Sequence, residues 1–241
     1  MSKKIYGIPV ATPVNPQKFG SVKTVNGVKP DDNGNIELEA ISTLQQQVAD
    51  LMYEPIAIDS LSLSPARVEI GSKITEVTAT WSLNKEPVSQ IFDGEDVPAA
   101  DRKITITSDA GWKSNTMFVF TATDERNLTV EKSAILAFTN GVYWGTLEDG
   151  IEIDSAAILT LFRSLQTTKV MNFDANAGAT QRIAYALPKS YGTPNFKVGG
   201  FDGGFSLAAT IDFTNASDYT ESYNVWLSDN TGLGSTLVNV S

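Results

Sequence analysis

The sequence contains neither histidine nor cysteine among its 241 residues. Without histidine, a Ser-His-Asp triad, a histidine general base and a histidine-ligated zinc site are all excluded. Without cysteine, there is no disulfide framework and no thiolate chemistry, as is typical of proteins made in a reducing cytoplasm. No run approaches the roughly 20 apolar residues that a bilayer-spanning helix needs, so we predict no membrane insertion.

Charge is distributed unevenly along the chain. The first 30 residues contain five lysines and no acidic residue, whereas the remainder has 13 basic and 28 acidic residues, a net charge of −15. An acidic body repels the phosphate backbone, so we predict no nucleic-acid partner. A basic arm on such a body favours docking onto an acidic protein surface. The alternative is a solvated terminus without fixed structure.

Residues 1–20 form the predicted arm. They show no hydrophobic periodicity, and Pro9, Pro13 and Pro16 favour extended backbone and remove hydrogen-bond donors. The next segment, VKTVNGVKPDDNGNIEL, contains two Asn-Gly pairs among residues that are typical of strands. Asn-Gly favours tight turns because both residues tolerate positive φ. We therefore predict a short β-ribbon, which would be only marginally stable alone.

A short coiled-coil helix is predicted to follow, completing a region that spans residues 21–54. Apolar side chains recur at intervals of three, four and three residues, and a proline follows the last turn. Burying these side chains contributes roughly 6–12 kcal/mol per chain, whereas ordering the backbone costs about 1–2 kcal/mol per residue, so the ribbon must associate as well. The alternative is a helix that packs on its own chain. The predicted oligomerisation residues are Ile41, Leu44, Val48 and Leu51.

Residues 55–139 have the pattern of a small immunoglobulin-like β-sandwich. In TEVTATWSLN, apolar and polar residues alternate, which puts Val77, Ala79, Trp81 and Leu83 on one face. Two later strands are separated by the segment DERN, with Asn127 as the expected left-handed turn residue. A buried tryptophan in an early central strand is typical of this fold.

Residues 140–241 are predicted to form a second, sandwich-like β domain with one helix. The helix is expected in IDSAAILTLFRSLQ, with Asp154 or Ser155 as its N-cap. In FSLAATIDFTN, apolar residues alternate with others without a break, so one face of this strand is expected to be buried. The helix stripe comprises Ile158, Leu161, Phe162 and Leu165, and the strand face comprises Phe205, Leu207, Ala209, Ile211 and Phe213.

Carboxylates are the remaining side chains that suggest catalysis. The segment LEDGIEID places Glu148, Asp149, Glu152 and Asp154 within seven residues, a grouping that would suit the acid/base pair of a glycosidase. A solvated turn followed by a helix N-terminus, where acids complement the helix dipole, accounts for the same residues. We adopt the second interpretation and predict no enzymatic activity and no cofactor.

Two loop motifs have a structural interpretation. Asp124, Glu125 and Asn127 could ligate calcium, but the spacing of an EF-hand is missing, so no metal is predicted. The segment VGGFDGGF resembles a phosphate-binding loop only in its glycine content, because it lacks the Lys-Ser/Thr pair and the following helix. It predicts a tight hairpin.

Tyr219 and Trp226 are candidates for contact with a glycan or a protein. In YNVWLS, Trp226 points opposite to Tyr223, Val225 and Leu227, so it is expected to face outward if those three residues face the core. Stacking on a sugar ring, burial in a subunit interface and ordinary packing are three open explanations.

Several segments, taken in order, resemble modular tail-fibre, baseplate or neck-appendage proteins of tailed bacteriophages. They are YGIPVATPVNPQKFG, VNGVKPDDNGNIEL, EVTATWSLNKEP with TATDERN and AFTNGVYWG, and ALPKSYG with FKVGGF and YTESYNVWLS. The resemblance implies a homotrimer whose residues 1–20 anchor it to other tail, neck or baseplate proteins. It also implies assembly in the host cytoplasm and location in the virion. The chain has no long fibrous repeat, which favours a compact adaptor or stub fibre.

The sequence thus predicts a mainly β, non-enzymatic virion protein with an extended arm, a trimerising region and two β domains. Isoleucine at the first and leucine at the second core position of a heptad nominally favours two strands, so the trimer is implied by the resemblance alone. The first alternative is a receptor-binding adhesin that recognises host surface glycans. The second is a polysaccharide depolymerase built on Glu148, Asp149 or Glu152.

Overall fold

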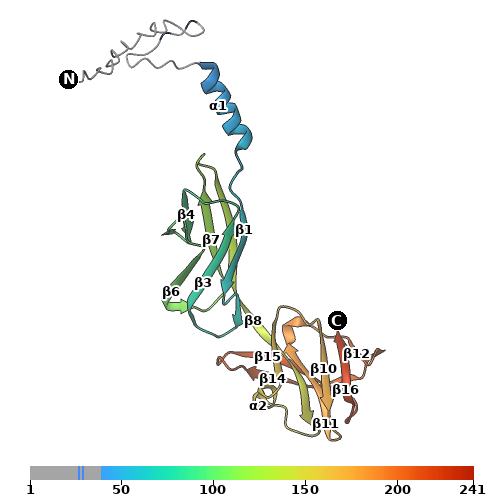
Figure 1. The fold of residues 1–241 in the computed structure, drawn as a ribbon. Coiled ribbons are helices and arrows are strands. Elements are labelled where there is room, and N and C mark those ends of the chain that lie inside the picture. Colours follow the sequence, from blue (N-terminus) through green and yellow to red (C-terminus); the bar gives the residue numbers. More distant parts are fainter. Residues whose placement is uncertain (1–26, 28, 30–38) are drawn as a thin grey trace, which may run out of the picture. The chain divides into compact units, whose positions relative to one another are not determined.

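The computed structural model describes Gly27, Lys29 and residues 39–241 (Figure 1). Apart from Gly27, which lies in a turn with a φ of 84°, the predicted arm and the turns of the predicted ribbon lie outside the described residues. The chain divides after Glu54 into two units, and the second comprises Pro55–Ser241. The described residues lie mostly in antiparallel strands, which confirms the predicted mainly β fold class.

Helix α1 (Glu39–Met52) is the described element of the first unit. It confirms the helix predicted here and ends three residues before Pro55, whose ring excludes the helical conformation for the preceding residue. On its polar side, Gln46 Nε2 donates to Asp50 Oδ1 at 3.0 Å, one turn further along. Neither helix among the described residues is long and apolar enough to cross a membrane.

The first half of the second unit is a two-sheet sandwich. As predicted, Val77, Ala79 and Trp81 alternate into its core, where the Trp81 ring lies 4.6 Å from that of Phe120. One sheet has the order β1-β3-β6; the facing strands run β8-β7-β4-β5, with β2 parallel to β8. The strands are β1 (Ile58–Ser64), β2 (Arg67–Glu69), β3 (Ile74–Leu83), β4 (Ser89–Phe92), β5 (Glu95–Val97), β6 (Lys103–Trp112), β7 (Thr116–Thr123) and β8 (Thr129–Glu148).

Strand β8 continues from this sandwich into a second one (Figure 1). The boundary predicted at Asn140-Gly141 lies inside this 20-residue strand. Up to Phe138 its buried side chains belong to the first core, and from Val142 onward they belong to two further cores, one on each face of the sheet.

The second sandwich therefore has a central sheet that is covered on both faces. Its order is β14-β15-β11-β8, and β9 pairs with the other side of β8. A sheet of order β10-β16-β12-β13 covers one face, and helix α2 packs on the other. Consequently Ile183–Pro188 of β11 are all buried, without alternation. The elements are α2 (Ser155–Leu159), β9 (Phe162–Gln166), β10 (Met171–Ala177), β11 (Gln181–Pro188), the 3₁₀ turn η1 (Lys189–Tyr191), β12 (Phe196–Val198), β13 (Phe201–Asp202), β14 (Phe205–Thr214), β15 (Thr220–Ser228) and β16 (Gly234–Val240).

The helix predicted in IDSAAILTLFRSLQ is much shorter than expected. The predicted N-cap is confirmed, because Asp154 Oδ1 accepts from Ala157 N at 2.8 Å. Helix α2 nevertheless ends at Leu159, and Phe162–Gln166 form β9, which pairs with β8. Ile158 and Leu161 are buried as expected, but Phe162 is exposed, so the prediction of one continuous apolar helix stripe is wrong. Pairing with the edge of β8 overrides the local helical pattern.

The prediction that one face of Phe205–Phe213 is buried is also wrong. A β-bulge between Leu207 and Ala209 shifts the register of β14 against β15. Because successive side chains point to opposite faces, the shift sends the apolar residues before and after it to different cores. Phe205 packs against Phe196 in one core with ring centroids 4.2 Å apart, Phe213 is buried in the other, and Leu207 is exposed.

The two sandwiches also meet through polar contacts. The buried carboxylate of Glu69 on β2 accepts a hydrogen bond from Tyr143 Oη at 2.8 Å and pairs with the guanidinium of Arg163 on β9. Burial, together with this bond to Glu69, raises the pKa of Tyr143, so the phenol stays a donor. Nearby, Asn215 Nδ2 donates to the Ile70 carbonyl at 2.8 Å. These contacts connect segments that lie far apart in sequence.

Gly71 allows a close approach at this junction, and we predict that Gly71→Ala is strongly destabilising. Its φ is +92°, and an added Cβ would lie 2.6 Å from Tyr219 Cβ and 3.0 Å from the Ser217 carbonyl oxygen. Strain and overpacking together should lower the free energy of unfolding by about 3 kcal/mol. Chemical denaturation followed by tryptophan fluorescence measures this change.

Gly94→Ala is the matched control. Gly94 has a φ of +90° but nothing within 4 Å of its added Cβ, so only the backbone strain of about 1 kcal/mol remains. If both variants lost the same free energy of unfolding, the contact with Tyr219 would not contribute to the effect of Gly71→Ala.

Candidate functional site

The apolar stripe of α1 is exposed in the single chain. Exposure is 52% for Ile41, 60% for Leu44, 46% for Val48 and 86% for Leu51. Met52 beside them is also exposed. These are the four residues predicted to mediate oligomerisation, and the other described residues of the first unit do not cover them.

A 14-residue helix with such a stripe has little to stabilise it alone. Isolated helices of this length are marginal in water, and most helical stability in proteins comes from packing of the apolar face. Covering each stripe side chain would contribute roughly 1.5–3 kcal/mol. The helix can therefore act as an association surface, and a partner helix with the same spacing fits it.

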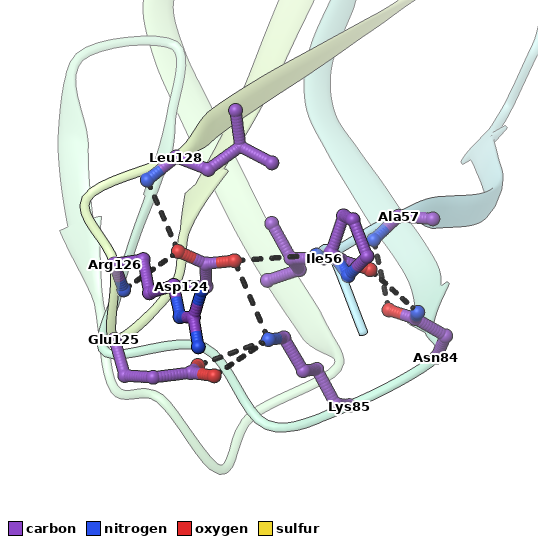
Figure 2. Close-up of polar contacts among 9 residues, drawn as sticks. Ile56, Ala57, Asn84, Lys85, Asp124, Glu125, Arg126 and Leu128 are labelled. Carbon is purple, nitrogen blue, oxygen red and sulfur yellow. Dashed lines mark hydrogen bonds and ion pairs between the residues drawn. The ribbon is translucent and has the colours of Figure 1, made fainter. Parts of the chain in front are cut away.

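A polar clamp fixes the chain directly after this helix (Figure 2). We use this name for Asn84 and Asp124 with the backbone of Pro55, Ile56 and Ala57. Asn84 Nδ2 donates to the Pro55 carbonyl at 2.9 Å, and Asn84 Oδ1 accepts from Ala57 N at 2.8 Å. Asp124 Oδ2 accepts from Ile56 N at 3.4 Å. Three consecutive residues are thus held by side chains from two loops.

The Asp124 carboxylate has partners on both oxygens although its side chain is fully buried. Its Oδ1 accepts from Arg126 N at 2.9 Å and from Leu128 N at 3.0 Å, and its Oδ2 lies 3.3 Å from Lys85 Nζ. Backbone N–H groups and an ammonium together stabilise a buried carboxylate that would otherwise be costly. Asn127 completes the loop with a φ of 62°, which confirms it as the left-handed turn residue.

Lys85 joins the clamp to Glu125 (Figure 2). Its Nζ donates to both Glu125 carboxylate oxygens at 3.0 Å. Desolvation acts to lower the pKa of Lys85, but the bonds and charges of Glu125 and Asp124 outweigh it and raise the pKa. The same hydrogen bond lowers the pKa of Glu125. The loop is held by ionised groups at neutral pH.

The loop considered for calcium is therefore filled by the protein's own donors. The oxygens of Asp124 accept from backbone N–H groups and Lys85, an arrangement that favours an anion held by donors rather than a cation ligand. Across residues 39–241, no three Asp or Glu side chains are grouped so that they could hold a metal ion.

Three of the four acidic residues of LEDGIEID make hydrogen bonds at a turn and a helix N-terminus, whereas Glu152 is exposed. Glu148 accepts from Thr180 Oγ1 and Gln181 Nε2, both at 2.8 Å. Asp149 pairs with Arg182, and Asp154 caps α2. None of the four lines the pocket at Phe162, the pocket at Trp226 or the pocket at Phe138. The turn and the helix cap account for the positions of Glu148, Asp149 and Asp154.

Tyr219 and Trp226 are placed apart and in different surroundings. Tyr219 is at the junction of the two sandwiches, where its Cβ faces Gly71. Trp226 packs 5.8 Å from Phe196, measured between ring centroids, and its Nε1 is buried without a hydrogen-bond partner in the described chain. Trp226 lies on the opposite face of its strand from the buried Tyr223 and Val225, as predicted, but the sheet containing β12 covers part of that face. Its side chain is therefore half-buried, and it lines a pocket of about 350 Å³ together with Phe196 and Phe205.

The segment VGGFDGGF forms the predicted hairpin. Strands β12 and β13 pair across Gly199 and Gly200, whose φ values are +56° and +90°. Phe201, just after this turn, is exposed.

The role of the clamp was not predicted from the sequence. DERN indicated a turn, but nothing local connects Asp124 with Ile56, 68 residues earlier. Likewise, no sequence motif connects Asn84 with Ala57, although the two residues are hydrogen-bonded. Comparison of the chain with protein-family models, curated proteins and solved structures gives no match in any of the three.

We predict that Asp124→Ala loosens the backbone at Ile56, near the start of the second unit. Loss of the buried acceptor leaves the N–H groups of Ile56, Arg126 and Leu128 without their partner, which should lower the free energy of unfolding by about 2–4 kcal/mol. Amide hydrogen exchange should accelerate at these three residues. Asp59→Ala removes the same charge from an exposed position and should change stability by at most about 0.5 kcal/mol. Unaltered exchange at Ile56 in Asp124→Ala would refute the role assigned to the clamp.

Proposed function

We propose that this chain is a non-enzymatic structural protein of a bacteriophage virion. In this proposal, three copies join through residues 21–54 and attach to a tail, neck or baseplate protein through residues 1–20. The trimer assembles in the host cytoplasm and remains in the virion, with residues 55–241 carried beyond the helix.

One observation carries the proposal, namely that the stripe of α1 is exposed while the chain immediately after it is clamped. Exposed apolar stripes of this spacing are typical of helices that pack against copies of themselves. The stripe of Ile41, Leu44 and Val48 is not covered by the other described residues of the first unit. Pro55–Ala57 of the second unit are held by Asn84 and Asp124.

The helix alone is too short to hold three chains together. Four buried side chains contribute roughly 6–12 kcal/mol, and ordering 14 residues costs about 1–2 kcal/mol each. The proposal therefore assigns additional association to the ribbon segment before the helix, which lies outside the described residues. Two Asn-Gly turns there suit strands exchanged around an axis.

The charge of the chain supports attachment through residues 1–20. Lys3, Lys4 and Lys18 lie in this segment without an acidic residue, whereas the whole chain has a net charge of −10. An opposite charge on the receiving surface would orient the docking. The domain order that resembles phage tail proteins supports the choice of a virion partner.

Replacing both Leu44 and Val48 by lysine should dissociate the trimer. An ammonium group cannot be buried at the axis without a partner, so the association free energy is lost. Light scattering of the full chain should give three times the chain mass of 25.9 kDa for the wild type and a single chain mass for the variant.

A charge-matched control uses the opposite side of the same helix. Lysine at both Gln46 and Ala49 adds the same two charges away from the stripe and should leave the trimer intact. A wild-type chain that is monomeric at micromolar concentration would rule out the proposed trimer.

Removing residues 1–20 should leave the fold and the trimer intact but prevent incorporation into particles. Quantitative immunoblotting of purified virions assembled with the shortened chain measures incorporation. A flexible Gly/Ser segment of equal length in place of residues 1–20 controls for spacing and should fail equally. Incorporation at the wild-type level would exclude these residues as the attachment arm.

A further inference from the structure

A groove of about 320 Å³ lies at one edge of the second sandwich. It is at the lower end of the size range of small-molecule sites. Four strands supply its lining: β8, β9, β10 and β16. The lining residues that could shape or contact a ligand are Gly145, Thr146, Phe162, Asp174, Asn176 and Ser235.

Phe162 gives this groove an aromatic wall. Its side chain is 70% exposed although it occupies a strand position paired with Trp144. The two rings lie 6.0 Å apart between centroids, and Trp144 in turn lies 6.2 Å from the buried Phe173. A row of aromatic rings that begins in the core thus supports a ring at the surface. The ring is held by a strand rather than by a mobile loop.

The polar lining residues have unused hydrogen-bonding groups. Asn176 and Ser235 are direct cross-strand partners, and Asp174 is two residues before Asn176, so the three side chains share the exposed face of their sheet, opposite the buried Phe173 and Ala175. Together with Thr146, they make no side-chain hydrogen bond to any part of the chain that the structure describes. A carboxylate, an amide and two hydroxyls offer both donors and acceptors.

Gly145, which lines the groove, lets Leu161 and Phe162 lie close to β8. Its φ is +152°, and an added Cβ would lie 3.2 Å from Leu161 Cδ2 and 3.7 Å from Phe162 Cδ2. Strand β9 pairs with β8 only as far as Trp144. From Gly145 onward, β8 has a described neighbour on one side, β11, so its other backbone edge is open toward the groove.

We propose that this groove binds a neutral saccharide. The partly positive C–H groups on one face of a sugar ring pack on the negative face of an aromatic ring, while its hydroxyls need mixed donors and acceptors nearby. Asp174 is the one charged residue among the described lining residues, so an anionic ligand is repelled. A purely apolar ligand would leave Asp174 and Asn176 without partners on burial.

This inference goes beyond the proposed structural function and does not depend on the trimer. It also places a saccharide contact at Phe162, away from Trp226, which is half-buried and lines a different pocket, and from Tyr219 at the junction. If three copies do assemble, three identical grooves would add avidity to a weak single site.

The test uses the full chain on an array of immobilised neutral hexose and N-acetylhexosamine oligosaccharides, printed beside sialylated and sulfated ones. Retained neutral oligosaccharides are then titrated in solution by calorimetry. We expect the wild-type chain to retain neutral members and Phe162→Ala to weaken their binding by about tenfold or more. Asn176→Ala should also weaken binding without changing the thermal midpoint.

Phe201→Ala is the matched control, because Phe201 is 81% exposed in the same unit but does not line the groove. It should bind like the wild type. The inference is overturned if no neutral oligosaccharide is retained, if only anionic ones are, or if Phe162→Ala binds like Phe201→Ala. A monomer that binds saccharide through Phe162 would retain this inference and refute the trimer.

Discussion

Strand β8 belongs to both sandwiches, and the arrangement of residues 55–241 depends on this shared strand. Its first half contributes one face to a core around Trp81, and its second half is buried on both faces. A shift of one residue in its pairing would move side chains out of every core at once, so its register is strongly specified. The contacts of Glu69 with Tyr143 and Arg163 add a second connection between the two sandwiches. The two sandwiches are therefore one unit, without a linker between them.

The features that could be predicted from the sequence are those with local causes. Alternation places Trp81 in the core, Asn127 adopts the left-handed conformation that its loop requires, and Asp154 caps the helix that follows it. Helix α1 has its own period and a terminating proline. In each case the signal and the structure that it specifies lie within a few residues of one another. The groove at Phe162 has no such signal, because its lining residues come from four separate strands.

The features that could not be predicted depend on distant partners. Phe162–Gln166 has a helical pattern but becomes a strand because the edge of β8 is available for pairing. The bulge in β14 puts Phe205 and Phe213 on opposite faces, whereas an unbroken strand would put them on the same face. Trp226 is partly covered by a sheet whose strands come from elsewhere in the chain. The clamp on Ile56 is built by a carboxylate 68 residues away.

The central claim concerns the stripe of α1, which the other described residues of the first unit leave exposed. The absence of native cysteine allows a spin label to be attached to one new cysteine, at Ala49, on the side of α1 away from the stripe. Helices packed on a common axis lie about 8–10 Å apart, so labels on the outer sides of neighbouring copies would come within roughly 40 Å. Electron–electron dipolar spectroscopy of the full chain should then detect coupling between copies, with the amplitude expected for three spins. Uncoupled labels in the fully labelled protein would contradict the account.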